Sequence, residues 1–152
     1  MQVRTKSTQP QLADLVGILL AAGGPTTLPA RVRWPLDQAL VWLQGEAAKS
    51  GALDPWRHRI DLQLSPDSGT GVKGAGRALA LLRDNGTLRP IGCLRWAAFR
   101  VDADALLRYR RLLMAMKPGD AQLLTRAARM WSMSVHELER IRQGSIPESA
   151  AV

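Results

Sequence analysis

Apolar residues recur at helical spacing through the first third of the chain. Between residues 11 and 22 the apolar positions lie three or four apart, as in an amphipathic helix, at Leu12, Leu15, Val16, Leu19 and Leu20. A second helix is expected from Pro35 to Gly51, with one apolar face formed by Leu36, Leu40, Leu43 and Ala47. Residues 59–64 alternate between apolar and polar side chains, which predicts a short half-buried strand.

A glycine-rich loop and another helix follow. Residues 65–76 hold four of the 13 glycines, which makes this stretch the best internal boundary of the chain. The apolar spacing then predicts a helix from about Lys73 to Asn85. Gly86 stands where a left-handed residue commonly ends a helix.

The next segment predicts a β-hairpin and a basic helix. Residues 87–91 and 93–101 form two extended stretches around a turn at Gly92. Asp102 or Asp104 is expected to cap the helix that comes next. This helix has apolar residues at Leu106, Leu107, Leu113 and Met114, and arginines on its other face at Arg108, Arg110 and Arg111.

The last third predicts two helices separated by a tight turn. Asp120 is expected to cap the first helix, and residues 132–134 form the turn. Ser134 and Glu137 have the S-x-x-E spacing of a capping box, in which each group satisfies a backbone N–H at the start of a helix. The second helix is expected to end at Gly144.

Length and composition indicate one compact domain. The chain has 152 residues, of which 46% are hydrophobic and 22% are charged, enough for a core without metal or disulfide support. Cys93 is the sole cysteine and cannot form an internal disulfide, so a reducing cytoplasm is the expected location. The apolar run at residues 15–22 is far shorter than the roughly 20 residues of a membrane helix, and no membrane partner is expected.

Positive charge is concentrated in the middle of the chain. The 21 Lys and Arg exceed the 13 Asp and Glu, which gives a formal net charge of +8. Ten of these 21 basic residues lie between Lys73 and Lys117, where acidic residues are few. A localised basic segment favours a polyanionic partner, because contacts with phosphates release counterions. A solvated basic surface without a ligand is the alternative.

The C-terminal run LLTRAARMWSMSVHELERIRQG resembles the helix-turn-helix of bacterial DNA-binding proteins. Ala128 is the small residue where the two helices would touch, Leu138 and Ile141 would bury the second helix, and Ser132 stands where a glycine commonly opens the turn. The resemblance implies DNA contacts from Arg126, His136, Arg140 and Gln143. A helical pair that only packs on the rest of the protein is the alternative.

The central runs AGRALALLRDNG, TLRPI and CLRWAAFRV are similar to a winged helix, in which a helix is followed by a two-stranded wing. Many winged-helix domains bind DNA and many others bind only proteins, so this pattern does not decide between the two functions. If the helix or the wing contacts DNA, the resemblance implies that five basic side chains bind phosphates: Lys73, Arg77, Arg89, Arg95 and Arg100.

Signals for catalysis or cofactor binding are weaker than the basic segment. The two histidines, His58 and His136, give no metal-ligand spacing with Cys93. The run GTGVKG has the spelling of a dinucleotide-binding loop but does not directly follow the predicted strand. Asp54 and Asp61 imitate part of an acidic nuclease cluster, for which a solvated strand face is the simpler explanation.

Sulfur and aromatic residues add a second functional hypothesis. Five tryptophans greatly outnumber the single tyrosine and the single phenylalanine, and tryptophan is enriched in the hot spots of protein interfaces. Core filling is the favoured interpretation of the methionines Met114, Met116, Met130 and Met133, and an adaptable binding surface is the alternative.

Together these patterns predict a mainly helical protein with a small β-hairpin. Residues 1–64 would form an N-terminal helical part, 65–117 a winged-helix-like basic segment, 118–146 a helix-turn-helix and 147–152, which begins at Pro147, a flexible tail. The expected function is DNA binding without enzymatic activity, cofactor or metal, as a regulator or DNA-associated subunit. A winged-helix adaptor that binds another protein is the alternative, and a homo-oligomer fits either function.

Overall fold

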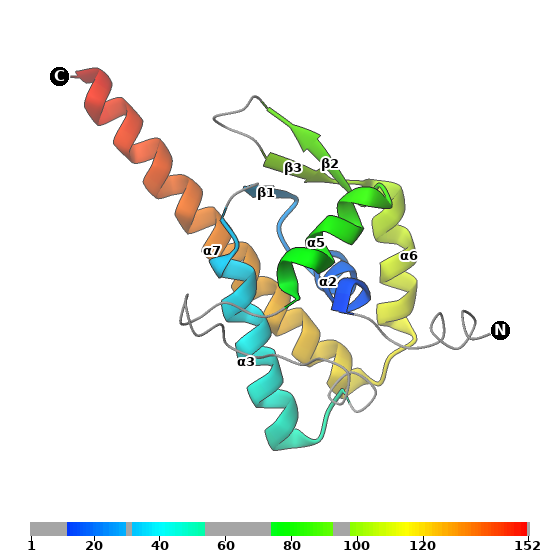
Figure 1. The fold of residues 1–152 in the computed structure, drawn as a ribbon. Helices are drawn as coiled ribbons and strands as arrows, with labels where there is room; N and C mark the ends of the chain where they lie inside the picture. Colours follow the sequence, from blue (N-terminus) through cyan, green and yellow to red (C-terminus); the bar gives the residue numbers. More distant parts are fainter. Residues whose placement is uncertain (1–11, 30–31, 54–73, 93–97, 152) are drawn as a thin grey trace.

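The fold is mainly helical, with one small antiparallel sheet. The computed structural model describes residues 12–29, 32–53, 74–92 and 98–151, with side chains described up to Ile141. In chain order its elements are α2 (Leu12–Ala21), β1 (Thr27–Pro29), α3 (Trp34–Ser50), α5 (Ala75–Asp84), β2 (Leu88–Ile91), β3 (Ala98–Val101), α6 (Ala103–Met114) and α7 (Pro118–Ala151) (Figure 1). The strand predicted at residues 59–64 lies outside the described residues.

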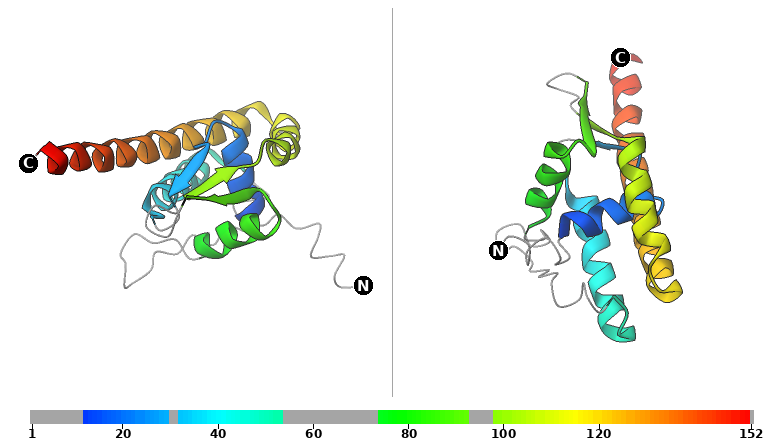
Figure 2. Two further views of the ribbon diagram at one scale, coloured as in Figure 1. Left: turned by 90° about the horizontal axis from the view of Figure 1, so that it is seen from above. Right: turned by 90° about the vertical axis from the view of Figure 1, so that its right-hand side faces the viewer.

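Helix α2 is buried all round. Every residue from Leu15 to Leu20 is buried, so the predicted amphipathic stripe extends to the whole circumference of the helix. Seen from above, α5 lies on one side of α2, and α6 and α7 lie on the other (Figure 2). A helix that is apolar on all sides requires such cover, because any side left open would expose apolar surface to water.

The contact between α2 and α6 depends on one glycine. A Cβ atom added at Gly17 would meet the ring of Tyr109, and the nearest ring atom, Cζ, would be only 2.4 Å away. The Tyr109 side chain belongs to the core and is 6% exposed. Glycine at this position therefore lets the ring of α6 lie directly on the backbone of α2.

Helix α3 confirms its predicted start and end. Pro35 lies in the first turn, and Gly51 ends the helix with a φ of 73° while its N–H donates to the carbonyl of Ala47. The buried face of α3 packs along α7. On the polar side of this contact, the guanidinium of Arg126 lies 5.2 Å from the centre of the Trp42 ring.

The predicted hairpin is present and belongs to a larger sheet. Strand β3 pairs antiparallel with β2 and also with β1, in the order β1-β3-β2. Strand β1 has only three residues, too few to give an alternating pattern of their own in the sequence. Their strand conformation depends on pairing with β3, and Pro29 is tolerated because β1 is an edge strand.

The predicted helix-turn-helix is wrong. Helix α7 is continuous from Pro118 to Ala151 and contains no turn at residues 132–134. Trp131 and Val135 lie four residues apart, one on each side of the predicted turn, and both are buried. Trp131 and Val135 therefore lie on the same buried side of one helix. Residues 131–135 include neither glycine nor proline, so nothing interrupts the helix there. Gly144, predicted to end the second helix, lies within α7, whose backbone is helical through Pro147.

Two polar residues of α7 have roles other than the predicted capping. Glu137 forms an ion pair with Arg140, with 2.7 Å between Oε1 and Nη2, so it does not complete a capping box with Ser134. Asp120 lies in the first turn of α7, and its Oδ1 accepts a hydrogen bond of 3.1 Å from the backbone N–H of Leu53. Leu53 has a φ of 56°, so this bond holds a non-glycine residue in a left-handed conformation just after α3.

Burial of the methionines differs from the expected core filling. Met114 is 79% exposed and Met133 is 66% exposed, whereas Trp131 is 1% exposed. The core-filling interpretation is therefore wrong for these two methionines. Their helices turn other residues toward α2 and α3, namely Tyr109 in α6 and Leu124, Ala128 and Trp131 in α7.

We predict that Gly17→Ala destabilises the protein by about 1–3 kcal/mol, because its Cβ overpacks the Tyr109 ring. Gly45→Ala is the matched control, since Gly45 lies within α3 and a Cβ there meets nothing within 4 Å. The control should gain about 0.5–1 kcal/mol from helix propensity. Urea unfolding of both variants measures the difference, and equal stability of the two would contradict the close packing of α2 on α6.

A second pair of variants tests the link between Asp120 and Leu53. Asp120→Ala removes the acceptor and the charge in the first turn of α7, whereas Asp120→Asn removes the charge and keeps an acceptor oxygen. We expect Asp120→Ala to be less stable than Asp120→Asn by about 1 kcal/mol, the net value of one hydrogen bond. Identical unfolding curves would show that this bond contributes nothing.

Candidate nucleic-acid interface

The exposed face of the hairpin carries two arginines side by side. In the register of β2 and β3, Arg89 stands directly opposite Arg100, and in the pairing of β1 and β3, Thr27 is the next residue in the same row. Leu88, Phe99 and Leu28 lie at alternate positions and belong to the core or pack on it. Because alternate residues of a strand point to opposite faces, the outward face is the one that carries Arg89 and Arg100.

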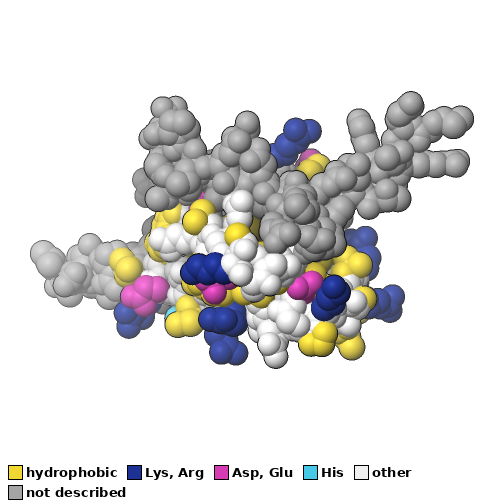
Figure 3. Space-filling model, turned by 90° about the horizontal axis from the view of Figure 1, so that it is seen from below, with side chains coloured by type: hydrophobic (Ala, Val, Ile, Leu, Met, Phe, Trp, Pro, Cys, Tyr) yellow, Lys and Arg dark blue, Asp and Glu magenta, His cyan; other side chains and the backbone are white. Residues whose placement is uncertain are grey.

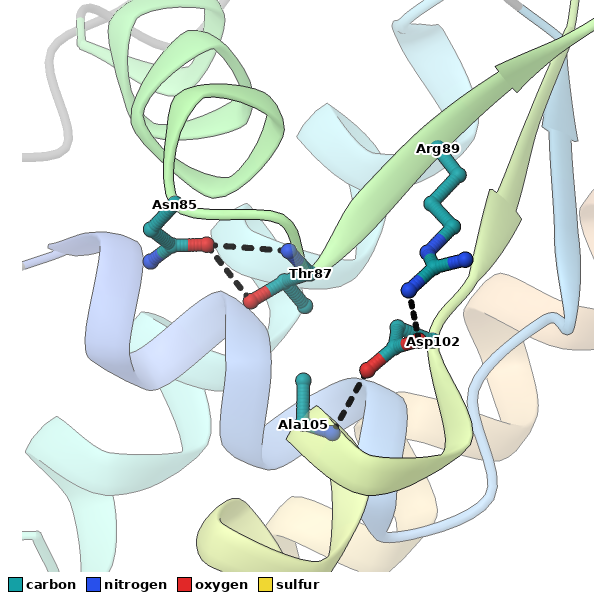
Figure 4. Close-up of polar contacts among 5 residues, drawn as sticks. All are labelled: Asn85, Thr87, Arg89, Asp102 and Ala105. Carbon is teal, nitrogen blue, oxygen red and sulfur yellow. Dashed lines mark hydrogen bonds and ion pairs between the residues drawn. The ribbon is translucent and has the colours of Figure 1, made fainter.

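Like charges at directly opposed positions destabilise a sheet, since cross-strand side chains are only about 5 Å apart at Cβ. Arg89 relieves part of this repulsion through an ion pair with Asp102, with 3.1 Å between Nη2 and Oδ1 (Figure 4). Arg100 forms no ion pair within the part of the chain that the structure describes. The face therefore presents one tethered guanidinium and one that is available to an external anion.

Asp102 fixes this arrangement to the rest of the fold. Its Oδ2 accepts a hydrogen bond of 3.0 Å from the N–H of Ala105, which confirms it as the cap of α6. The backbone N–H of Asp102 donates to the carbonyl of Thr87, at 2.8 Å. Arg89 is thus held by a carboxylate whose position is set by both the hairpin and α6.

The turn between α5 and β2 is ordered by its own side chains. The Asn85 Oδ1 accepts from the N–H of Thr87 at 3.0 Å and from its hydroxyl at 2.7 Å (Figure 4). Gly86 has a φ of 87°, which confirms the predicted left-handed residue at the end of α5. These contacts set the direction in which the hairpin leaves the helix.

Helix α5 places a further arginine on the surface. Ala75, Ala78 and Leu82 are buried against the core, and Arg77 is exposed. Arg83 lies beside Asp84, with 3.6 Å between Nε and Oδ1, so its charge is partly balanced. Arg77 has no such partner among the described residues.

The other predicted DNA contacts lie on α7 or outside the described residues. Arg126 lies over Trp42, Arg140 pairs with Glu137, and His136 is exposed, all on α7. Helix α2 lies between α5 and α7, so these two helices are on different sides of α2 (Figure 2). Lys73 and Arg95 lie outside the described residues. Gln143 is in the part of α7 where side chains are not described.

The surface seen from below has a mixed character. Lys and Arg side chains are spread over this face, with acidic and hydrophobic side chains between them, and they do not form one continuous basic area (Figure 3). On this face, the basic side chains therefore stand at separate positions (Figure 3).

A cavity that sequence reasoning missed lies where the end of α3 meets the start of α7. Its volume is about 920 Å³, and its lining includes Glu46, Lys49, Asp120 and Arg126. The Lys49 Nζ lies 3.3 Å from the Glu46 Oε2, and the Asp120 carboxylate accepts the hydrogen bond from the Leu53 N–H. Glu46, Lys49 and Asp120 thus already take part in contacts within the protein. The cavity forms between segments distant in the chain, so the sequence alone does not reveal it.

The described residues hold neither a candidate metal site nor a candidate membrane helix. No group of three or more His, Cys, Asp or Glu side chains in these ranges is placed to hold a metal ion. In the same part of the chain, no helix has both the length and the apolar character to cross a membrane.

No protein-family model, curated protein or solved structure matches this chain. The geometry of its own residues therefore carries the functional argument.

The opposed arginines give a prediction about stability. Arg100→Thr removes the like charge and places a residue of high strand propensity in β3, so it should stabilise the protein by about 0.2–1 kcal/mol. Arg100→Lys keeps the charge and should give no comparable gain. Thermal unfolding at low and high salt separates the loss of charge repulsion from the gain in strand propensity, because only the effect of the charge decreases as the salt concentration rises. A threonine variant less stable than the lysine variant at low salt would contradict the repulsion.

Proposed function

We propose that this chain is a non-enzymatic DNA-binding protein whose contact surface is formed by α5 and by the outward face of the hairpin. The observation that carries the proposal is the cross-strand pair of Arg89 and Arg100 on the exposed side of the sheet. Such a pair costs folding stability in the free protein. Phosphates placed against both guanidinium groups would remove that cost and add charge-assisted hydrogen bonds.

The order of elements supports the same proposal. Helix α5 is followed directly by the two-stranded hairpin β2–β3, as in the winged-helix pattern that the sequence resembles. Arg77 on the helix and Arg100 on the hairpin would then contact the same duplex from two elements. Lys73 and Arg95, next to α5 and in the hairpin connection of the sequence, are proposed as further contacts.

The chemistry of these groups favours contacts with the backbone of the duplex over readout of its bases. Guanidinium groups bind phosphates in bidentate fashion, and phosphate contacts position a protein without reading sequence. The described outward face of the hairpin offers Thr27 beside its two arginines and no amide side chain that would read adenine. We therefore propose binding with little dependence on base sequence.

The proposed surface leaves out the residues of α7. Arg126, His136, Arg140 and Gln143 were assigned to DNA on the basis of a helix-turn-helix that the chain does not contain. We propose a cytoplasmic location as well, on the ground that Cys93 has no second cysteine to pair with.

The test is the salt dependence of binding to a labelled duplex of random sequence, measured by fluorescence anisotropy. Arg77→Gln with Arg100→Gln should weaken binding at low salt by about tenfold and reduce the slope of log affinity against log salt by nearly two. The matched control, Arg129→Gln with Arg140→Gln, removes the same charge from α7 and should change the slope little.

The outcomes separate a defined surface from general attraction. Equal losses in both double variants would show that the net charge of +8 attracts the duplex without a specific face. An unmodified protein that binds no duplex even at low salt would overturn the proposal.

A further inference from the structure

Helix α6 exposes a stripe of apolar and basic residues on the side away from the core. Leu107, Arg110, Arg111 and Met114 follow the spacing i, i+3, i+4, i+7, which places them along one side of a helix. Leu107 is 52% exposed and Met114 is 79% exposed. The opposite side is fixed, because Ala105 and Tyr109 are buried.

The arginines of α6 have no acidic partner among the residues that the structure describes. Leu112 is 49% exposed as well, but it lies with Arg108 on another flank of the helix and outside this stripe. Within the described residues, Arg108, Arg110 and Arg111 form no ion pair, and Arg108 has only a ring contact of 6.0 Å with Tyr109. We define the four residues of the stripe as the α6 surface: Leu107, Arg110, Arg111 and Met114.

We infer that the α6 surface docks an acidic protein segment that carries apolar side chains at helical spacing. The apolar residues Leu107 and Met114 supply the buried contact, and Arg110 and Arg111 supply complementarity to carboxylates around it. The distance from Leu107 to Met114 along the axis is about 10 Å, or two turns, so an amphipathic helix of a few turns can cover it.

Charge argues against a second copy of this chain as the occupant. A symmetric contact through the α6 surface would place Arg110 and Arg111 of one copy against the same residues of the other. Like charges brought together in an interface cost several kcal/mol. A partner of opposite charge turns the same residues into favourable contacts.

The apolar residues argue against nucleic acid on this surface. Phosphates would contact the arginines, but Leu107 and Met114 would gain nothing from a hydrated polyanion. The surface is also separate from the proposed DNA contacts, because α6 begins after Asp102 and runs away from the sheet (Figure 1). The inference therefore stands or falls independently of the proposed DNA binding.

The experiment uses the full chain and a labelled synthetic peptide in which leucines at alternating spacings of three and four are separated by glutamates. We expect anisotropy to report binding of this peptide, and at least about tenfold weaker binding of a peptide with alanine in place of leucine. Equal affinity for both peptides would show that only nonspecific attraction of charge is involved, and would overturn the inference. Absence of binding of both peptides would overturn it as well.

Variants locate the contact. Leu107→Ala with Met114→Ala, and separately Arg110→Glu with Arg111→Glu, should each weaken binding of the leucine peptide by about tenfold or more. Leu81→Ala is the matched control, because Leu81 is exposed to a similar degree on α5, and it should change the affinity less than twofold. If neither α6 variant weakened binding of the leucine peptide, the assignment of the peptide contact to α6 would be wrong.

A duplex titration distinguishes the two surfaces. The Leu107→Ala/Met114→Ala variant should bind the random duplex as the unmodified protein does, because it changes no charge. If this variant lost duplex binding as well while its thermal unfolding was unchanged, the stripe would belong to a nucleic-acid surface and the protein-docking inference would be overturned. Failure of the unmodified protein to bind DNA, with peptide binding retained, would reject only the DNA proposal.

Discussion

The complete burial of α2 is the constraint on which the other elements depend. Six consecutive residues, from Leu15 to Leu20, are buried, and no single neighbouring helix can cover a helix on all sides. Helix α5 covers one side, while α6 and α7 cover the other. Gly17 lets the Tyr109 ring of α6 approach the backbone of α2 directly. These contacts fix which sides of α5 and α6 remain exposed, and both proposed binding surfaces lie on those sides.

Asp102 links the two surfaces through a single side chain. One carboxylate oxygen caps α6 and the other binds Arg89 on the hairpin, while its backbone N–H joins β3 to Thr87. The hairpin face precedes this residue in the chain, and the α6 surface follows it. A change in the position of Asp102 would therefore alter the direction of the hairpin and the start of α6 together.

Both surfaces expose groups that a partner of complementary chemistry would bind. Arg89 and Arg100 oppose each other across two strands, and Leu107 and Met114 are exposed among arginines. Along α7, by contrast, Arg140 is paired with Glu137 and Arg126 lies over Trp42. Features that are unfavourable without a partner are typical of binding sites, because evolution retains them for the complex.

The sequence by itself determined the elements whose signals are local. Gly51 and Gly86 ended helices, and the cap of α6 was narrowed to Asp102 or Asp104, because each of these signals needs only its immediate neighbours. The turn predicted at residues 132–134 failed because buried Trp131 and Val135 keep α7 helical, and a capping-box spacing cannot reveal that packing. Only the tertiary structure decided that β1 pairs with β3, that Arg89 faces Arg100 and that Met114 is exposed, because each depends on contacts between segments distant in the chain.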